Sequence, residues 1–124
     1  MLSVHGMKTL RDIRERKEKR RKALEQNLPS IVEQLKALGA LKVILFGSFV
    51  RGDTGSWSDL DLIAVMPSSL SGKEWRRKIY GEVDRGIACD IAVYNEKELE
   101  ETIPISSFLR HALQEGKTIY EKKP

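Results

Sequence analysis

Two aspartates, Asp59 and Asp61, stand one residue apart where an apolar run begins. Because side chains alternate along a strand, both carboxylates are expected to point to the same side. Alone they would repel each other, whereas a divalent cation between them would relieve the repulsion, and hard oxygen ligands suit Mg²⁺. Ten residues separate Asp59 from Gly47 and Ser48, whose backbone N–H groups and hydroxyl suit a phosphate. A phosphate-binding turn beside a metal-binding carboxylate pair indicates nucleotide chemistry.

A third aspartate, Asp90, interrupts another apolar run. The bulky face of this expected strand consists of Ile87, Cys89, Ile91 and Val93. Asp90 would lie on the other face between two alanines. A buried carboxylate without a partner is costly, so we expect Asp90 to share a metal with Asp59 and Asp61. The alternatives are an aspartate at the sheet edge that faces water, and an ion pair with an arginine such as Arg51.

Apolar runs and helical spacings predict the elements that position these residues. Strands are expected over residues 41–46, 58–66, 87–94 and 117–120, and helices over 8–26, 30–38, 49–51, 72–85, 96–101 and 106–115. We expect residues 1–7 to fray, a new helix to begin at Pro29, and residues 52–56 to form a mobile loop over the site. This order predicts an α/β (α+β) fold, a small mixed sheet of about four strands flanked by helices.

The helical faces are expected to be explained mainly by core packing. The inward residues of the two C-terminal amphipathic helices are predicted to be Trp75, Ile79, Val83, Phe108, Leu109, Ala112 and Leu113. Arg76, Arg77 and Lys78 should face solvent, with the alternative that one of them reaches a triphosphate. Asn95 is expected to cap the helix that follows it, and His111 to lie at the surface or core rim.

Length and composition indicate how many domains to expect and which broad classes of protein this chain can belong to. The chain of 124 residues suits one domain, and its single cysteine, Cys89, excludes an internal disulfide and agrees with a reducing cytosol. No apolar run approaches the roughly 20 residues that cross a bilayer, and the N-terminus lacks the apolar core of a signal peptide. We therefore expect a soluble, cytoplasmic protein without a membrane partner.

The net charge of +4 is unevenly distributed along the chain. Residues 8–22 contain nine Lys/Arg and three Asp/Glu, a balance of +6, which leaves thirteen basic and fifteen acidic residues, or −2, elsewhere. We divide the chain into a basic helical extension, residues 1–27, and a domain, residues 28–124. The extension is expected to be a solvated helix, and the alternative is a handle for an acidic partner or RNA.

The Gly47-Ser48 pair, the ten-residue spacing and the Asp59-Leu60-Asp61 sequence resemble the DNA polymerase β-type nucleotidyltransferase superfamily. Chain length and flanking strands are most similar to its minimal nucleotidyltransferase branch, which includes MntA-like antitoxins. The resemblance implies that Asp59 and Asp61 bridge two Mg²⁺ ions, and that Asp90 completes the shell of one ion and accepts the proton of the attacking hydroxyl. It also implies that Gly47 and Ser48 hold the β- and γ-phosphates, with Arg51 either facing phosphate or structural.

The same resemblance implies a substrate and a partner. We expect transfer of AMP from ATP to a hydroxyl of a partner protein, a HEPN-type toxin that this chain would neutralise as its antitoxin. The first alternative is a binding module that neutralises its partner by contact, without catalysis. The others are a nucleotidyltransferase acting on RNA ends or on a small molecule. Oligomeric state stays open.

Overall fold

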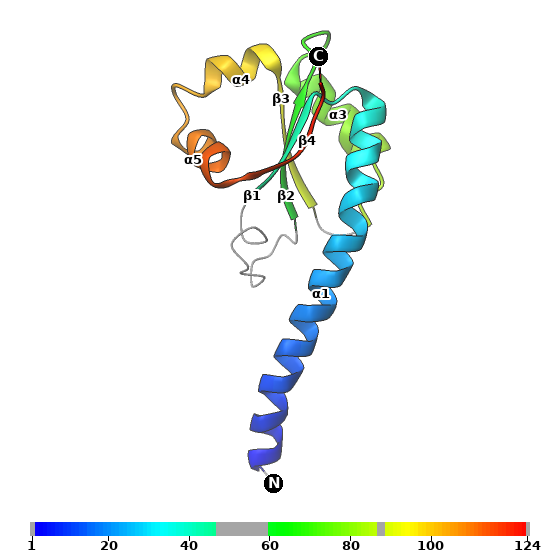
Figure 1. The fold of residues 1–124 in the computed structure, drawn as a ribbon, viewed down its shortest axis with the longest axis vertical. Coiled ribbons are helices and arrows are strands. Elements are labelled where there is room, and N and C mark those ends of the chain that lie inside the picture. The colour runs from blue at the N-terminus through cyan, green and yellow to red at the C-terminus, as the bar shows by residue number, and fades with distance from the viewer. Residues whose placement is uncertain (1, 47–59, 87–88, 124) are drawn as a thin grey trace.

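The structure is a computed structural model that describes residues 2–46, 60–86 and 89–123. Four strands form one mixed sheet, namely β1 (Lys42–Phe46), β2 (Leu60–Met66), β3 (Cys89–Asn95) and β4 (Lys117–Glu121). Their order is β3-β2-β1-β4, with β1 antiparallel to β2 and β4 and with β2 parallel to β3 (Figure 1). The mixed four-stranded sheet predicted from the sequence is confirmed, and β3 forms one of its edges.

Four described helices cover the two faces of this sheet. They are α1 (Leu2–Leu38), α3 (Gly72–Glu82), α4 (Glu96–Thr102) and α5 (Ser107–Glu115). The C-terminal part of α1 and all of α3 pack on one face, whereas α4 and α5 pack on the other (Figure 1). The helix expected over residues 49–51 and the loop over 52–56 lie outside the described residues.

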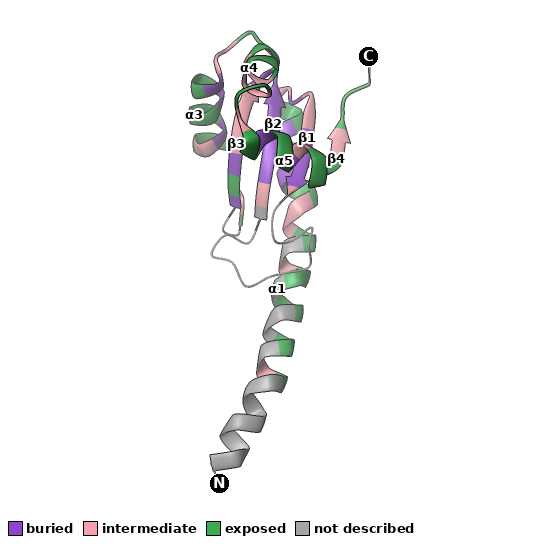
Figure 2. Cartoon of the chain, turned by 90° about the vertical axis from the view of Figure 1, so that its left-hand side faces the viewer, coloured by how far each residue is buried: buried purple, intermediate pink, exposed green. Residues whose placement is uncertain are grey.

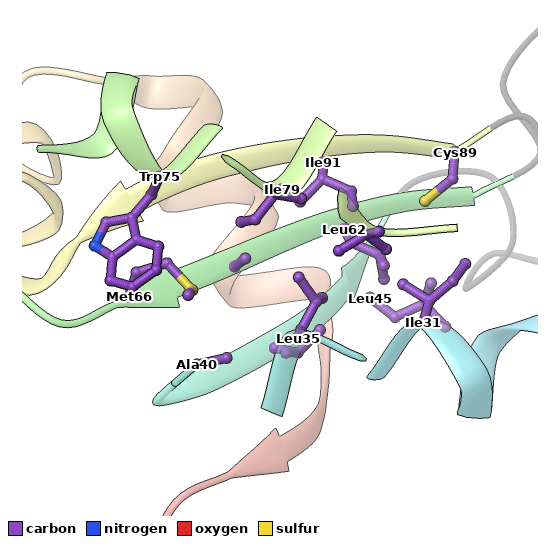
Figure 3. Packing of buried hydrophobic residues seen from close by; sticks show 13 residues of the cluster. Ile31, Leu35, Ala40, Leu45, Leu62, Met66, Trp75, Ile79, Cys89 and Ile91 are labelled. Carbon is purple, nitrogen blue, oxygen red and sulfur yellow. The ribbon is translucent and has the colours of Figure 1, made fainter. Parts of the chain in front are cut away.

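The core is divided by the sheet into two clusters. On the α1/α3 side, Ile31, Leu35, Leu62, Trp75 and Ile79 belong to the larger cluster (Figure 3). The smaller cluster on the α4/α5 side contains Ile44, Ile63, Val65, Leu109 and Ala112. Buried residues accordingly concentrate in the strands, while the part of α1 beyond the sheet has none among its described side chains (Figure 2). The inward positions predicted for Trp75, Ile79 and Val83 are confirmed.

The N-terminal helix differs from the prediction. Two helices with a break at Pro29 and a frayed start were expected, but α1 is continuous from Leu2 to Leu38 with Pro29 inside it. An interior proline costs about 3 kcal/mol because it removes a hydrogen bond and crowds the preceding turn. Full burial of Ile31 and Leu35 contributes about 1.5–3 kcal/mol each, which offsets this cost.

The C-terminal end of α1 is set by a glycine. Gly39 has a φ of 109°, which residues with a Cβ rarely adopt, and its N–H donates to the Lys36 carbonyl at 3.0 Å. The Ala40 N–H donates to the Leu35 carbonyl at 3.0 Å, which completes a Schellman motif and turns the chain into β1. Among the described helices, none is both long and apolar enough to span a bilayer.

The helices on the α4/α5 side of the sheet begin at residues whose side chains cap them. Asn95 ends β3 and accepts a hydrogen bond from the Glu98 N–H at 2.8 Å, so the predicted cap is confirmed. In α5, Leu109 and Ala112 are buried as predicted, and His111 is exposed, with its Nε2 3.2 Å from the Glu115 carboxylate. The inward position predicted for Phe108 is wrong, because its side chain is 54% exposed at the flank of the buried stripe.

Candidate active site

Asp61 and Asp90 lie side by side on neighbouring strands. Each is the second residue of its strand, and the parallel register of β2 and β3 pairs them directly. Paired residues on adjacent strands point to the same face, about 4.8 Å apart in the hydrogen-bonding direction. This face is the α4/α5 side, opposite the one that buries Leu62, Cys89 and Ile91. The two carboxylates therefore share one side of the sheet, at the end where β2 and β3 begin.

Both carboxylates line a pocket of about 500 Å³, a volume within the range of small-molecule sites. Its described lining consists of Phe46, Asp61, Arg76, Tyr80, Asp90, Ile91, Ala92 and Phe108. The pocket thus combines two acidic groups, one cationic group and several aromatic rings. That set can bind a metal-complexed anion at one end and a flat apolar group at the other.

The exposure of Asp90 differs from the prediction, which placed this carboxylate in a buried position. Asp90 is exposed on an edge strand, so the cost of burying an unpaired charge gives no reason to expect a partner. Asp61 is half-buried. The case for a shared site therefore depends on the register of Asp61 and Asp90 and on their common pocket.

The edge of β3 at Asp90 is anchored from α3. The Tyr80 hydroxyl accepts a hydrogen bond from the Ile91 N–H at 2.9 Å and donates a longer one to the Ile91 carbonyl at 3.4 Å. Arg85 donates from Nη1 to the Cys89 carbonyl at 3.2 Å. Both chain neighbours of Asp90 are therefore held through their backbone, which fixes the strand that carries this carboxylate. No role was predicted for Tyr80 or Arg85, because side-chain contacts to an edge strand have no sequence signature.

Arg76 is the basic residue of α3 that reaches the pocket. Its guanidinium lies 5.5 Å from the centre of the Tyr80 ring, and Arg76 lines the same pocket as the two carboxylates. Arg77 and Lys78 do not line the pocket, and Lys78 lies instead over Trp75 at 5.9 Å. All three are exposed, as predicted. Arg76 is the residue that fits the alternative in which one of them reaches a triphosphate.

The sequence model of the nucleotidyltransferase domain family matches residues 27–118. This chain belongs to the nucleotidyltransferase domain family. A crystal structure at 1.40 Å resolution of a candidate nucleotidyltransferase from Sulfolobus solfataricus aligns with a TM-score of 0.60 and 19% identity, covering 86% of this chain and 87% of that chain. At that identity the likeness shows a common fold. No curated protein matches the sequence. The nucleotidyltransferase domain expected from the sequence is confirmed, and its assignment to the minimal, MntA-like branch stays a prediction.

The nucleotidyltransferase domain brings together two of its predicted site residues, Asp61 and Asp90. Asp59, Gly47, Ser48 and Arg51 lie outside the described residues, so their roles stay predictions. Within the described part of the chain, no three His, Cys, Asp or Glu side chains gather closely enough to hold a metal. Two hard carboxylates in register fit Mg²⁺ as a partial ligand set, which Asp59 would complete.

Cys89 lies next to Asp90 in sequence but on the opposite side of the sheet of this nucleotidyltransferase domain. Its side chain packs in the larger cluster near Ile31 and Leu62 (Figure 3). Burial raises the pKa of the Cys89 thiol to about 12; the Arg85 guanidinium lowers it in part, and the Asp90 and Asp61 carboxylates raise it further. The thiol is therefore neutral near pH 7, which suits packing and not a nucleophile or thiolate ligand.

Proposed function

We propose that this chain is a Mg²⁺-dependent nucleotidyltransferase that moves AMP from ATP to a hydroxyl of a partner protein. The observation that carries the proposal is the register of Asp61 and Asp90 at a common pocket, in a domain of this family. The partner fitting the resemblance is a HEPN-type toxin, whose modification by this antitoxin would neutralise it. ATP, the protein acceptor and the cytoplasmic location belong to the proposal.

In the proposed reaction, an acceptor oxygen forms a bond to the α-phosphorus as the bond to the β-phosphate oxygen breaks and pyrophosphate leaves. Asp90 accepts the proton of the attacking hydroxyl, and its exposed position gives an acceptor direct access. Asp61 and Asp90, with Asp59, would hold divalent cations that neutralise the triphosphate and activate the hydroxyl. Arg76 would balance negative charge at the pocket rim.

The surroundings of the pocket favour a large acceptor. Asp90 is exposed on an edge strand of the sheet. A protein can present a tyrosine, serine or threonine hydroxyl at such an open site.

The test compares Asp90→Asn with Asp84→Asn, a matched change at an exposed aspartate outside the pocket. The purified chain is incubated with Mg²⁺, a HEPN-type toxin as the partner, and ATP labelled at either the α- or the γ-phosphate. AMP transfer labels the partner from α-labelled ATP alone. We expect Asp90→Asn to reduce labelling at least about a hundredfold, which corresponds to about 2.7 kcal/mol of lost transition-state stabilisation. Asp84→Asn should label the partner like wild type.

Two results would contradict the proposal. Labelling from γ-labelled ATP would indicate a kinase-type transfer. An Asp90→Asn variant that labels nothing yet still protects cells from the partner would assign neutralisation to contact alone, as the non-catalytic alternative requires.

One observation favours a second candidate, transfer to RNA ends. The basic part of α1 extends beyond the end of the sheet at which β2 and β3 begin, the end that carries Asp61 and Asp90 (Figure 1). Phosphates bound along this helix could bring an RNA end towards the pocket. Nucleotide incorporation into RNA that weakens steeply with salt would identify this function.

A further inference from the structure

We propose that Phe108, supported by Phe46, forms a stacking platform for the base of the nucleotide bound at the Asp61–Asp90 pair. This inference rests on the proposed nucleotidyl transfer and assigns the part of the pocket that the carboxylates do not explain. Phe46 and Phe108 come from β1 and α5, 62 positions apart in the sequence, and both line the pocket.

The platform continues the row of carboxylates across the sheet. Asp90 pairs with Asp61 across β3 and β2, and Asp61 pairs with Phe46 across β2 and β1. The Phe108 ring then lies 5.6 Å from the Phe46 ring, centre to centre, at an interplanar angle of 78°. This edge-to-face contact orients Phe108 through Phe46 and the backbone of β1.

The exposure of Phe108 points to a ligand. Phe108 is 54% exposed although the next residue, Leu109, is fully buried in the same helix. An aromatic ring gains from leaving water, so a half-exposed, oriented ring in a pocket has surface to offer a bound group. Ile105 is even more exposed, at 82%, but does not line the pocket. Phe108 is thus distinguished from ordinary exposed apolar residues by its position.

A single nucleotide could occupy both ends of this pocket. Its phosphates suit the metal-binding carboxylates and Arg76, and its base has a flat π-face for Phe108. Asp61 pairs with Phe46 on the neighbouring strand, and the Phe46 ring contacts Phe108, so the carboxylates and the rings lie on adjacent strands of the sheet. A 5′-nucleotide whose phosphate is held through a cation can extend across one strand spacing of about 4.8 Å.

The ring end of the pocket also predicts a specificity. Phe46, Ala92 and Phe108 offer no side-chain hydrogen-bonding groups there, so the described lining would recognise the base by stacking. Stacking tolerates every base and favours larger rings. Purine nucleotides should therefore bind more tightly than pyrimidine nucleotides, with little discrimination between ATP and GTP.

The test measures the affinity of the whole chain for Mg-ATP and Mg-tripolyphosphate by titration calorimetry. Tripolyphosphate has the anionic tail of ATP and no base. We expect Phe108→Ala to weaken Mg-ATP binding roughly 5- to 150-fold, the range of lost base–aromatic stacking, and to leave Mg-tripolyphosphate binding unchanged. Phe108→Trp should retain Mg-ATP affinity. Ile105→Ala is the matched control and should bind both ligands like wild type.

The other possible outcomes distinguish failure of the stacking platform from failure of the proposed function. Unchanged Mg-ATP affinity in Phe108→Ala, or equal weakening for both ligands, would overturn the stacking platform. An unchanged Mg-ATP affinity with a raised KM for the acceptor would assign the ring to the acceptor instead of the base. If wild type binds Mg-tripolyphosphate but Mg-ATP no better, only the platform fails. If it binds neither ligand, the proposed function fails with it.

Discussion

At the scale of single residues, Arg76 has neighbours that its position in the sequence does not reveal. It is flanked in α3 by other exposed basic residues, and it alone among Arg76, Arg77 and Lys78 lines the pocket with Asp61 and Asp90. Its guanidinium over the Tyr80 ring is oriented by a cation–π contact. An oriented cation that lines the same pocket as two carboxylates suits the triphosphate that would bind there with its metal.

Arg76→Gln should therefore weaken binding of Mg-tripolyphosphate by about tenfold, since charge-assisted hydrogen bonds contribute about 1.5–3 kcal/mol and exposure reduces that value. Arg77→Gln makes the same change one position along the helix and should have no measurable effect. Titration calorimetry with both variants decides the matter. Equal affinities for Arg76→Gln and wild type would show that Arg76 does not contact the anion.

These residues also show what could be predicted from the sequence. Alternation along a strand was enough to separate Asp90 from Cys89 and Ile91, and the structure confirms that separation. Which of the consecutive residues Arg76, Arg77 and Lys78 faces the pocket depends on how α3 is rotated about its own axis. Hydrophobic periodicity does not define that rotation closely enough to distinguish neighbouring residues. The contact of Phe46 with Phe108 depends on how α5 crosses the sheet, which no local pattern encodes.

At the scale of elements, the exposed edge of β3 is held by residues from and just beyond α3. Tyr80 satisfies the N–H and carbonyl of Ile91, and Arg85 satisfies the carbonyl of Cys89. The segment with Arg85 is itself tied to α1, because the Gln34 side chain donates to the Asp84 carbonyl at 2.7 Å and accepts from its N–H at 2.8 Å. α1, α3 and β3 are thereby connected by a chain of polar contacts.

Removing the Tyr80 hydroxyl tests this connection. Tyr80→Phe should reduce the free energy of unfolding by about 1–3 kcal/mol, because two partly buried backbone groups lose their partner. Urea denaturation followed by circular dichroism measures the change. Tyr120→Phe is the control, since Tyr120 lies on β4 at the opposite edge of the sheet from β3, and it should unfold like wild type. A Tyr80→Phe variant as stable as wild type would indicate that water replaces the hydroxyl at the strand edge.

Strand positions were predicted closely because apolar runs that end at polar residues define them. The continuity of α1 was not predicted, because Pro29 indicates a helix start when only local preferences are considered. The burial of Ile31 and Leu35 against the sheet is a tertiary effect and reverses that preference. Gly39, in contrast, ends the helix where the sequence placed the stop.

At the scale of the whole molecule, the basic residues of α1 and the residues with which it packs on the core occupy different parts of the helix. The core contacts of the helix involve Leu28, Ile31, Val32, Leu35 and Leu38, all in its C-terminal part. The basic residues of 8–22 precede this part, on the length of helix that extends beyond the sheet (Figure 1). Exposed ion pairs such as Arg11–Glu15 at 3.7 Å and Arg21–Glu25 at 3.4 Å stabilise the helix locally. The boundary expected at residue 27 stays a prediction, and it falls within one continuous helix.

A chain that starts at residue 23 tests this boundary and the choice of acceptor together. Because exposed i, i+4 pairs contribute only about 0.3–0.5 kcal/mol each, its free energy of unfolding should stay within about 1 kcal/mol of wild type. Its affinity for Mg-ATP and its labelling of a protein partner should not change, since the pocket lies outside the deleted segment. An RNA acceptor predicts the opposite for transfer: loss of the basic segment would weaken RNA binding and flatten its dependence on salt. Urea denaturation, calorimetry and transfer assays at two salt concentrations separate these cases. A truncated chain that unfolds would instead show that the extension belongs to the domain.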